Sequence, residues 1–296
     1  MVDALRQPAD RAEESSISIV LPLHNEEAMI GQILTQLEAV GRYDEIIAVD
    51  DGSTDNTAAE VARHPAVRLL QHSYNIGNGG AIKTGLRHAS GDIIVVMDGD
   101  GQHPVSEIPN LLQHMDRYDM VVGARTQESE TNIGRDIANW FFNLYASYVV
   151  GAQVADLTSG FRAFRRDAVK PFIPILPNGF SSPTTLTIAF FRSGYTVKYQ
   201  PFRAPARVGR SKIRPIRDGL RFLLTITRLA VMFVPLKVFM PISLAMMAVG
   251  GSYTLGKLAI RGAFSGFGSL IFTVGFLMLM LGLISEQIAM LRALRE

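Results

Sequence analysis

Hydrophobic and polar positions along the first two thirds of the chain predict strands that alternate with helices. Residues such as Met29, Ile33, Leu37 and Val40 recur at helical spacing, and Asn25 is the expected N-cap of that helix. A buried strand is predicted in each of five segments: 17–25, 45–57, 67–73, 92–97 and 119–125. Repeated strand–helix units of this length predict an α/β fold with a mostly parallel, doubly wound sheet and right-handed crossovers.

The last third of the chain follows a different pattern, because residues 238–255 and 264–285 carry no charged side chain. At 1.5 Å per residue these stretches would be about 27 and 33 Å long as helices, close to the hydrocarbon thickness of a bilayer. We predict transmembrane helices over 236–260 and 264–290. The alternative, a helical hairpin in a soluble core, is weaker because the flanks lack a polar stripe.

An amphipathic helix is predicted between these two parts, over residues 216–234. Arg214, Arg217, Arg221 and Arg228 fall at helical intervals, and apolar residues such as Leu223 lie away from that stripe. We expect this helix to lie on the membrane surface and to bring a lipid phosphate to the cationic edge of the protein. A simple amphipathic linker without a ligand contact explains the pattern equally well. The expected organisation adds a polar tail (1–16) and a catalytic domain (17–215).

Composition and charge indicate on which side of the membrane the first domain is expected. The chain has 296 residues, 48% of them hydrophobic, and a net charge of +2; its mean hydropathy is +0.18. Residues 1–16 lack the apolar core of a secretory signal, so we expect an integral membrane protein whose catalytic domain faces the cytosol. The basic residues within 203–221 agree with this orientation, although Lys257 and Arg261 do not. The absence of cysteine excludes disulfides and thiolate metal sites.

Candidate chemistry begins where the strand at 92–97 ends. Asp98 and Asp100 emerge there with Gly99 and Gly101 between and after them, at the sheet edge where α/β proteins place their ligands. Carboxylates with room for a phosphate suit Mg²⁺ or Mn²⁺ that holds a diphosphate. A solvated turn of aspartate and glycine is the competing interpretation.

Two other strand ends carry weaker signals. Asp51 follows the second strand, where a carboxylate can accept hydrogen bonds from a nucleoside or simply cap the next helix. Gly77, Gly79 and Lys83 suggest a phosphate cradle. However, Ile82 stands where a P-loop or a dinucleotide fingerprint requires glycine, so both of those motifs fail.

Several motifs occur together in a characteristic order. They are LPLHNEE (21–27), VDDGSTD (49–55), NIGNGGAIKTG (75–85), MDGDGQHP (97–104) and DLTSGFRAF (156–164). On these motifs residues 17–215 resemble family 2 glycosyltransferases, and most of all their dolichol-phosphate-mannose-synthase-like branch. That branch moves a sugar from a nucleotide diphosphate to a polyprenyl phosphate. The resemblance implies the Rossmann-like glycosyltransferase A fold.

The resemblance also implies roles for individual residues. Asp100, Arg125 and Asp156 would be catalytic, and Asp98, Asp100 and Gln102 would hold the metal and diphosphate. Donor contacts would come from Pro22, Glu26, Asp51, Lys83, Arg207 and Lys212, and acceptor contacts from Arg125, Arg135, Asn139, Ser159 and Arg162. Asp156 would orient Arg162 or a donor hydroxyl rather than accept the reaction proton. The chain departs from the family pattern at Asn78, where lysine is usual, and at Asn139, where some relatives have serine. The spacing of the basic residues in the 207–213 loop also differs, and the alternative interpretation of this loop is a solvated basic linker.

The chemistry implied is a single displacement with inversion at the anomeric carbon. A phosphate acceptor is already anionic, so it needs no general base. The expected partners are a GDP- or UDP-linked sugar, a polyprenyl phosphate and the membrane, with no nucleic acid; the glycines of the last two helices also suit a homo-oligomer. Alternatives are a soluble or saccharide acceptor and a non-catalytic nucleotide-sugar-binding subunit. A processive polysaccharide synthase is disfavoured because Trp140 lacks the Gln-x-x-Arg-Trp context.

Overall fold

The computed structural model describes residues 15–126, 133–179, 181–205 and 215–293, and the side chains of these ranges except 133–139, 215–222 and 292–293. The chain forms two compact units, Met1–Gly219 and Leu220–Glu296. The first unit contains the sheet and the candidate site. The second contains the long apolar helices.

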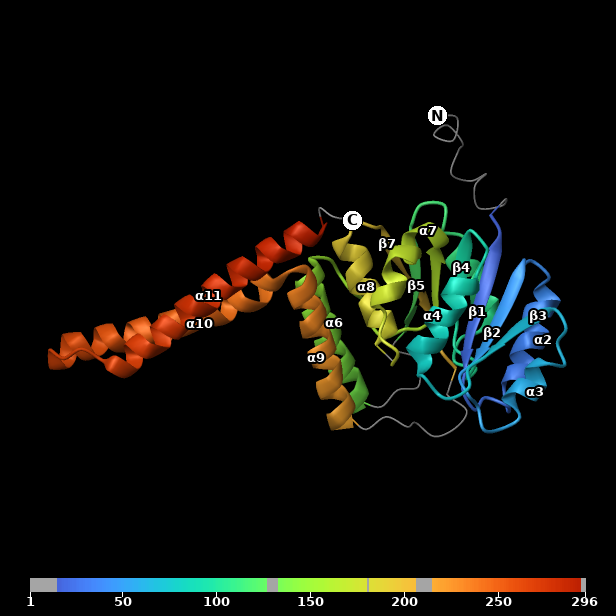
Figure 1. Ribbon diagram of the computed structural model, residues 1–296, viewed down its shortest axis with the longest axis horizontal. Coiled ribbons are helices and arrows are strands. Elements are labelled where there is room, and N and C mark those ends of the chain that lie inside the picture. Colours follow the sequence, from blue (N-terminus) through green and yellow to red (C-terminus); the bar gives the residue numbers. More distant parts are fainter. Residues whose placement is uncertain (1–14, 127–132, 180, 206–214, 294–296) are drawn as a thin grey trace, which may run out of the picture. The chain divides into compact units, whose positions relative to one another are not determined.

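The first unit is built on a seven-stranded sheet in the order β3-β2-β1-β4-β6-β5-β7 (Figure 1). The strands are β1 (Ile17–Leu23), β2 (Glu45–Asp50), β3 (Val67–Gln71), β4 (Ile93–Val96), β5 (Met120–Arg125), β6 (Arg162–Arg165) and β7 (Val197–Phe202). Neighbouring strands pair in parallel, except that β6 is antiparallel to both β4 and β5. The predicted mostly parallel α/β sheet is therefore confirmed.

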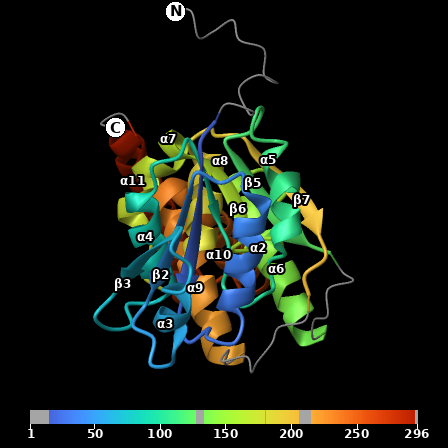
Figure 2. The same cartoon turned by 90° about the vertical axis from the view of Figure 1, so that its right-hand side faces the viewer.

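Helices cover both faces of this sheet. They are α2 (Ile30–Val40), α3 (Thr57–Val61), α4 (Asn78–His88), α5 (Ile108–Leu112), α6 (Ile133–Val150), α7 (Arg166–Val169) and α8 (Ser182–Arg192), with 3-10 turns η2 (Val105–Glu107) and η3 (Lys170–Ile175). Figure 2 shows α2 and α4 on opposite sides of β1 and β2. On the α4 side Gly85 permits the close approach, because a Cβ there would overlap the side chain of Val20.

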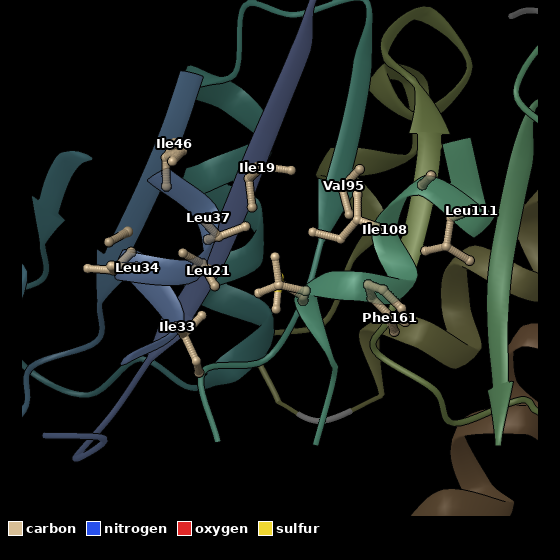
Figure 3. Packing of buried hydrophobic residues seen from close by; sticks show 14 of the residues in the cluster. Ile19, Leu21, Ile33, Leu34, Leu37, Ile46, Val95, Ile108, Leu111 and Phe161 are labelled. Carbon is tan, nitrogen blue, oxygen red and sulfur yellow. The ribbon is translucent and has the colours of Figure 1, made fainter. Parts of the chain in front are cut away.

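The main hydrophobic core lies between the sheet and the helices α2 and α5. Helix α2 buries Ile30, Ile33, Leu34 and Leu37, the positions that recur at helical spacing. Figure 3 shows three of these side chains, Ile33, Leu34 and Leu37, packed over the strands together with Ile108 and Leu111 of α5. Asn25 is not the N-cap of α2: Met29 precedes the helix, and the φ angle of Asn25 is 59°.

The order of the strands brings three strand ends together. β1 lies between β2 and β4, with Leu23 paired to Asp50 and Val20 paired to Val96. The segments that follow β2 and β4 therefore leave the sheet at the same edge, on either side of β1. The carboxylates that follow these strands are thus brought to one end of the sheet.

The second unit contains two long apolar helices, α10 (Pro235–Arg261) and α11 (Gly266–Ala293), which follow α9 (Pro215–Phe233). Both are long and apolar enough to cross a membrane, and only 11% and 17% of their most apolar windows are buried. Gly250 and Gly275 lie where the two helices pack, because a Cβ on either would stand within 3 Å of backbone atoms of the facing helix. A Cβ on Gly256 would meet nothing within 4 Å. At the hairpin's open end the carboxylate of Glu286 accepts a hydrogen bond of 3.1 Å from the backbone N–H of Leu236.

Candidate functional site

Asp51 organises the loop between β3 and α4. Its Oδ1 accepts hydrogen bonds from Nδ1 of His72 (2.7 Å) and the N–H of Ile76 (2.9 Å), and its Oδ2 accepts one from the N–H of Gly77 (2.7 Å). Burial alone would raise the pKa of Asp51, but these hydrogen bonds outweigh it and hold the pKa below its ordinary value. The side chain is 2% exposed. Asp51 therefore fixes this loop, and neither caps the next helix nor presents an open carboxylate.

The loops that follow β1 and β2 are joined by hydrogen bonds. Oδ1 of Asn25 accepts from the N–H of Thr54 (2.8 Å), and the N–H of Asn25 donates to Oγ of Ser53 (2.9 Å). The N–H of Glu26 donates to Oγ1 of Thr57 (2.8 Å). Pro22 is buried within β1, whereas Glu26 is half-buried in the loop after it. Of the two predicted donor residues, Pro22 is thus fixed in the sheet, and Glu26 lies on a loop whose backbone is bonded to the segment that follows β2.

The second carboxylate group follows β4. The side chain of Asp98 is 34% exposed, and Asp100 is 8% exposed with its Oδ1 accepting from the N–H of Gln102 (3.1 Å). Gly101 has a φ of 79°, in the left-handed region that favours glycine. A Cβ on Gly160 would stand 2.9 Å from Oδ2 of Asp98, so glycine there leaves the carboxylate room.

The buried ring of His103 holds the backbone of this turn. Its Nδ1 accepts a hydrogen bond of 2.9 Å from the N–H of Asp98, which assigns the proton of the neutral ring to Nε2. The ring stacks on Phe161 at 5.1 Å. Burial lowers the pKa of His103 despite the nearby carboxylates of Asp98 and Asp100, so the ring is neutral at neutral pH. The sequence motif contained His103, but nothing in its pattern indicated this packing role.

An ion pair joins β5 to the segment before β6. Nε and Nη2 of Arg125 donate to Oδ2 and Oδ1 of Asp156 at 2.8 and 2.9 Å, and Nη2 also donates to Oγ1 of Thr158 at 2.5 Å. Burial opposes both charges, yet the pair outweighs burial: the pKa of Asp156 lies below its ordinary value and that of Arg125 above it. Asp98 and Asp100 also raise the pKa of Arg125, so these charges lie within electrostatic range of one another.

Two predicted acceptor ligands lie in the protein interior. Arg162 is 1% exposed and Ser159 is 2% exposed. The guanidinium of Arg162 donates to protein oxygens, and Oγ of Ser159 accepts from the N–H of Phe161 (3.3 Å). Direct contact of Arg162 with an acceptor is therefore wrong for this structure, because no face of its guanidinium reaches the surface. Asp156 pairs with Arg125 rather than with Arg162.

The glycine-rich segment supports protein contacts rather than an open cradle. The N–H of Gly80 donates to the carbonyl of Asn178 (3.1 Å), and Nζ of Lys83 donates to Oδ1 of the same residue. A Cβ on Gly79 would overlap the carbonyl of Pro177. The glycines therefore let the loop that precedes α8 dock on the N-terminus of α4, and Lys83 is engaged there.

The remaining predicted residues are only partly described. Arg207 and Lys212 lie outside the described residues. Arg135 and Asn139 belong to the helix α6, but their side chains are not among those described.

Later in the same helix, Asn143 binds both sides of the Asp156 segment: its Oδ1 accepts from the N–H of Leu157 (3.0 Å) and its Nδ2 donates to the carbonyl of Ala155 (2.8 Å).

The residues after β4 fit a divalent cation that is shared with a diphosphate. Across the described ranges no three His, Asp or Glu side chains form a cage of their own. Mg²⁺ commonly binds through one or two carboxylates and completes its shell with substrate phosphates and water. Asp98, Asp100 and Gln102 provide the hard oxygen donors that such an ion prefers.

A separate cavity of about 320 Å³ lies away from this site. It is lined by the end of α4 and by α7 and η3, including Arg87, Arg166 and Lys170. Because the N–H of Arg166 binds the carbonyl of Asp92, which precedes β4, this cavity is at the opposite edge of the sheet. It is therefore not part of the candidate site.

Comparisons with known proteins agree with the fold and the motifs. The chain matches the family described as Glycosyl transferase family 2 over residues 18–172, just over half of its length, and the GtrB C-terminal hairpin over residues 234–291. Similar proteins include the undecaprenyl-phosphate 4-deoxy-4-formamido-L-arabinose transferases of Shewanella sediminis, 33% identical over 57% of this chain and 56% of that one, and of Salmonella typhimurium, 32% identical over 60% and 59%. The match thus spans less than two thirds of these relatives.

Solved structures are similar as well. Glucosyl-3-phosphoglycerate synthase from Mycobacterium tuberculosis, crystallised with Mn²⁺, uridine diphosphate and glucosyl-3-phosphoglycerate, has a TM-score of 0.60 and 22% sequence identity. The likeness covers 75% of this chain and 84% of that chain. It confirms the predicted glycosyltransferase A type of fold.

Proposed function

Because the chain belongs to glycosyl transferase family 2, we propose that it transfers a sugar from a nucleotide diphosphate sugar to a polyprenyl phosphate. The observation that carries the proposal is the pairing of Arg125 with Asp156 within electrostatic range of Asp98 and Asp100. One sheet edge thereby combines a cation for an attacking phosphate with carboxylates for a metal-bound diphosphate. The names of the similar transferases, which act on undecaprenyl phosphate, support this acceptor class.

Donor binding is assigned to the loops after β1, β2 and β4. Pro22, Glu26 and the loop fixed by Asp51 would contact the nucleoside of a GDP- or UDP-linked donor. Asp98, Asp100 and Gln102 would hold Mg²⁺ or Mn²⁺, whose charge offsets that of the leaving diphosphate. The presence of Mn²⁺ or Mg²⁺ with uridine diphosphate in crystals of the structurally similar glucosyl-3-phosphoglycerate synthase supports this assignment. Lys83, Arg207 and Lys212 remain proposed contacts of the donor phosphates.

The acceptor phosphate would be held by Arg125 together with Arg135 and Asn139. An oxygen of that phosphate forms a bond to the anomeric carbon while the bond from this carbon to the donor diphosphate breaks, which inverts the configuration. No proton has to be removed, because the attacking oxygen is already anionic. Asp156 fits this scheme because its low pKa and its ion pair make it an orienting group for Arg125 rather than a base.

The apolar hairpin supports a lipid acceptor. Helices α10 and α11 would anchor the chain in the membrane, and the match of residues 234–291 to the GtrB C-terminal hairpin agrees with this role. We place the catalytic unit on the cytosolic face, with the helix α9 at the membrane surface. A polyprenyl tail would then remain in the bilayer while its phosphate reaches Arg125.

Lipid mass spectrometry of purified full-length protein tests the proposal. The protein is given undecaprenyl phosphate, Mn²⁺ and a panel of GDP- and UDP-sugars, with EDTA in a parallel sample. We expect one donor to yield a polyprenyl-phosphate sugar that is absent with EDTA. Product only in a sample that contains a water-soluble saccharide in place of the lipid would indicate a soluble acceptor, and nucleotide binding without any product would indicate a non-catalytic subunit.

A further inference from the structure

Arg162 is a buried charged side chain whose hydrogen-bond partners among the described residues include no carboxylate. Nε donates to the carbonyl of Ser159 (2.7 Å), Nη2 to the carbonyl of Leu157 (3.2 Å), and Nη1 to Oγ1 of Thr187 (2.8 Å). Burial of a cation is costly unless its N–H groups are satisfied, and removal of the partners of a buried charge is strongly destabilising. A neutral side chain of similar size would fill the same space without this cost. The contacts of the guanidinium therefore point to a role beyond packing.

The contacts converge on the turn that carries Asp156. Oδ1 of Asp156 accepts from the N–H groups of Thr158 and Ser159, each at 3.1 Å. Arg162 donates to the carbonyls of the first and third residues after Asp156, so the turn is bonded through its N–H groups to Asp156 and through its carbonyls to Arg162. The same Asp156 presents its two oxygens to Arg125.

The position of Arg162 in the sheet makes this support rigid. It is the first residue of β6, where it pairs with Val96 at the end of β4 and with Val122 in β5. β4 leads to Asp98 and Asp100, and β5 ends at Arg125. One residue is thus tied to the strands that carry the proposed metal ligands and to the turn that orients the proposed acceptor cation.

We infer that Arg162 is a positioning residue for the acceptor half of the transfer reaction, acting through the Asp156 turn on Arg125. The inference rests on the proposed function and specifies how the side chain of Arg125 is held in position at the proposed acceptor site. Burial lowers the pKa of Arg162 to about 10, so the guanidinium stays protonated at neutral pH and keeps all its donors. The rigid fork of a guanidinium can reach three oxygens in fixed directions, which the single ammonium of lysine cannot.

Steady-state kinetics of Arg162→Lys test the inference, with Arg165→Lys as the matched control. Arg165 lies on the same strand, but its Nη2 donates to the carbonyls of Met115 and Asp116, away from the turn. For Arg162→Lys we expect kcat/KM for undecaprenyl phosphate to fall at least about tenfold with a raised acceptor KM. The KM for the nucleotide sugar should change less than about twofold, and Arg165→Lys should leave both values within about twofold of wild type.

A second pair of variants keeps the test valid if Arg162→Lys does not fold. Thr187→Val removes one acceptor of the guanidinium, whereas Thr185→Val removes a hydroxyl of the same helix whose Oγ1 binds the carbonyl of Ser181. We expect Thr187→Val to raise the acceptor KM about threefold and Thr185→Val to leave it unchanged.

Three results would overturn the inference. The first is an acceptor KM within twofold of wild type in both Arg162→Lys and Thr187→Val. The second is a fall in kcat with unchanged values of KM, since a merely structural role lowers only the fraction of active enzyme. The third is the absence of product from wild-type protein with any donor, which refutes the proposed function and the inference with it.

Discussion

Replacement of Asp156 by asparagine separates an orienting carboxylate from a catalytic base. The substitution keeps the shape of the side chain but removes the charge that pairs with Arg125. In the wild type the side chains of Arg125 and Asp156 are only 24% and 10% exposed, so solvent screens the pair weakly. Removing one partner of a buried pair costs about 3–5 kcal/mol. Because the asparagine amide can still accept one of the hydrogen bonds, we expect the lower end of this range, about 3 kcal/mol.

The pH dependence of stability gives this prediction a second readout. Arg125 holds the pKa of Asp156 below the value of about 3.9 that the carboxyl has in an unfolded chain. The contribution of the pair is therefore fully present above that unfolded value and is lost as the pH falls through the lower folded pKa. The free energy of unfolding of the first unit can be measured by urea denaturation, followed by fluorescence, between pH 3 and pH 7. It should fall less in acid for Asp156→Asn than for wild type.

Kinetics of the same variant decide the role of Asp156. If it orients Arg125, Asp156→Asn should raise the acceptor KM at least about tenfold while donor affinity stays within about twofold. Asp156→Glu, which keeps the charge but shifts it by one methylene, should recover part of the loss. Complete loss of turnover with unchanged acceptor binding would refute the reasoning, because that result is the signature of a lost base.

Three further substitutions test other parts of the structure. Gly160→Ala should weaken Mn²⁺-dependent nucleotide binding several-fold in calorimetry at unchanged thermal stability, because its Cβ would displace the carboxylate of Asp98. Leu34→Ala, at a position with 0% exposure, should cost about 2–5 kcal/mol in urea denaturation. Gly275→Ala should lower the melting temperature in detergent, because its Cβ would stand 2.9 Å from a carbonyl of the facing helix, whereas Gly256→Ala, with nothing within 4 Å, should not.

The parallel part of the sheet could be predicted because its strands are local apolar runs, two of which, β2 and β4, lead into aspartate and glycine. Every residue of β1, β2 and β4 is buried except the half-buried first residue of β1 and of β2, so the pattern is visible in a window of a few residues. The carboxylates at their ends follow from the same pattern. Their proximity follows from the rule that carboxyl ends of parallel strands share one edge.

β6 and its arginine could not be predicted in the same way. The strand has four residues, and it begins and ends with arginine, which in a short segment usually indicates a surface. The burial of Arg162 depends on Thr187, which is 25 residues away and on another element. No periodicity in the sequence signals such a pairing, and the resemblance alone assigns this residue a role, at the acceptor.

The glycine-rich segment shows how the same residues can serve a contact that the sequence does not indicate. A helix N-terminus is a favourable anion site because its N–H groups are unpaired and its dipole is positive. At α4 the N–H of Gly80 already donates to the carbonyl of Asn178, and Lys83 donates to the side chain of the same residue, nearly a hundred positions away. In the proposed donor complex this N–H and this ammonium would therefore be less free to donate to phosphate oxygens. A cation held by Asp98 and Asp100 is the arrangement that the described residues offer, and for this reason we expect nucleotide affinity to depend on the divalent ion more strongly than on Lys83.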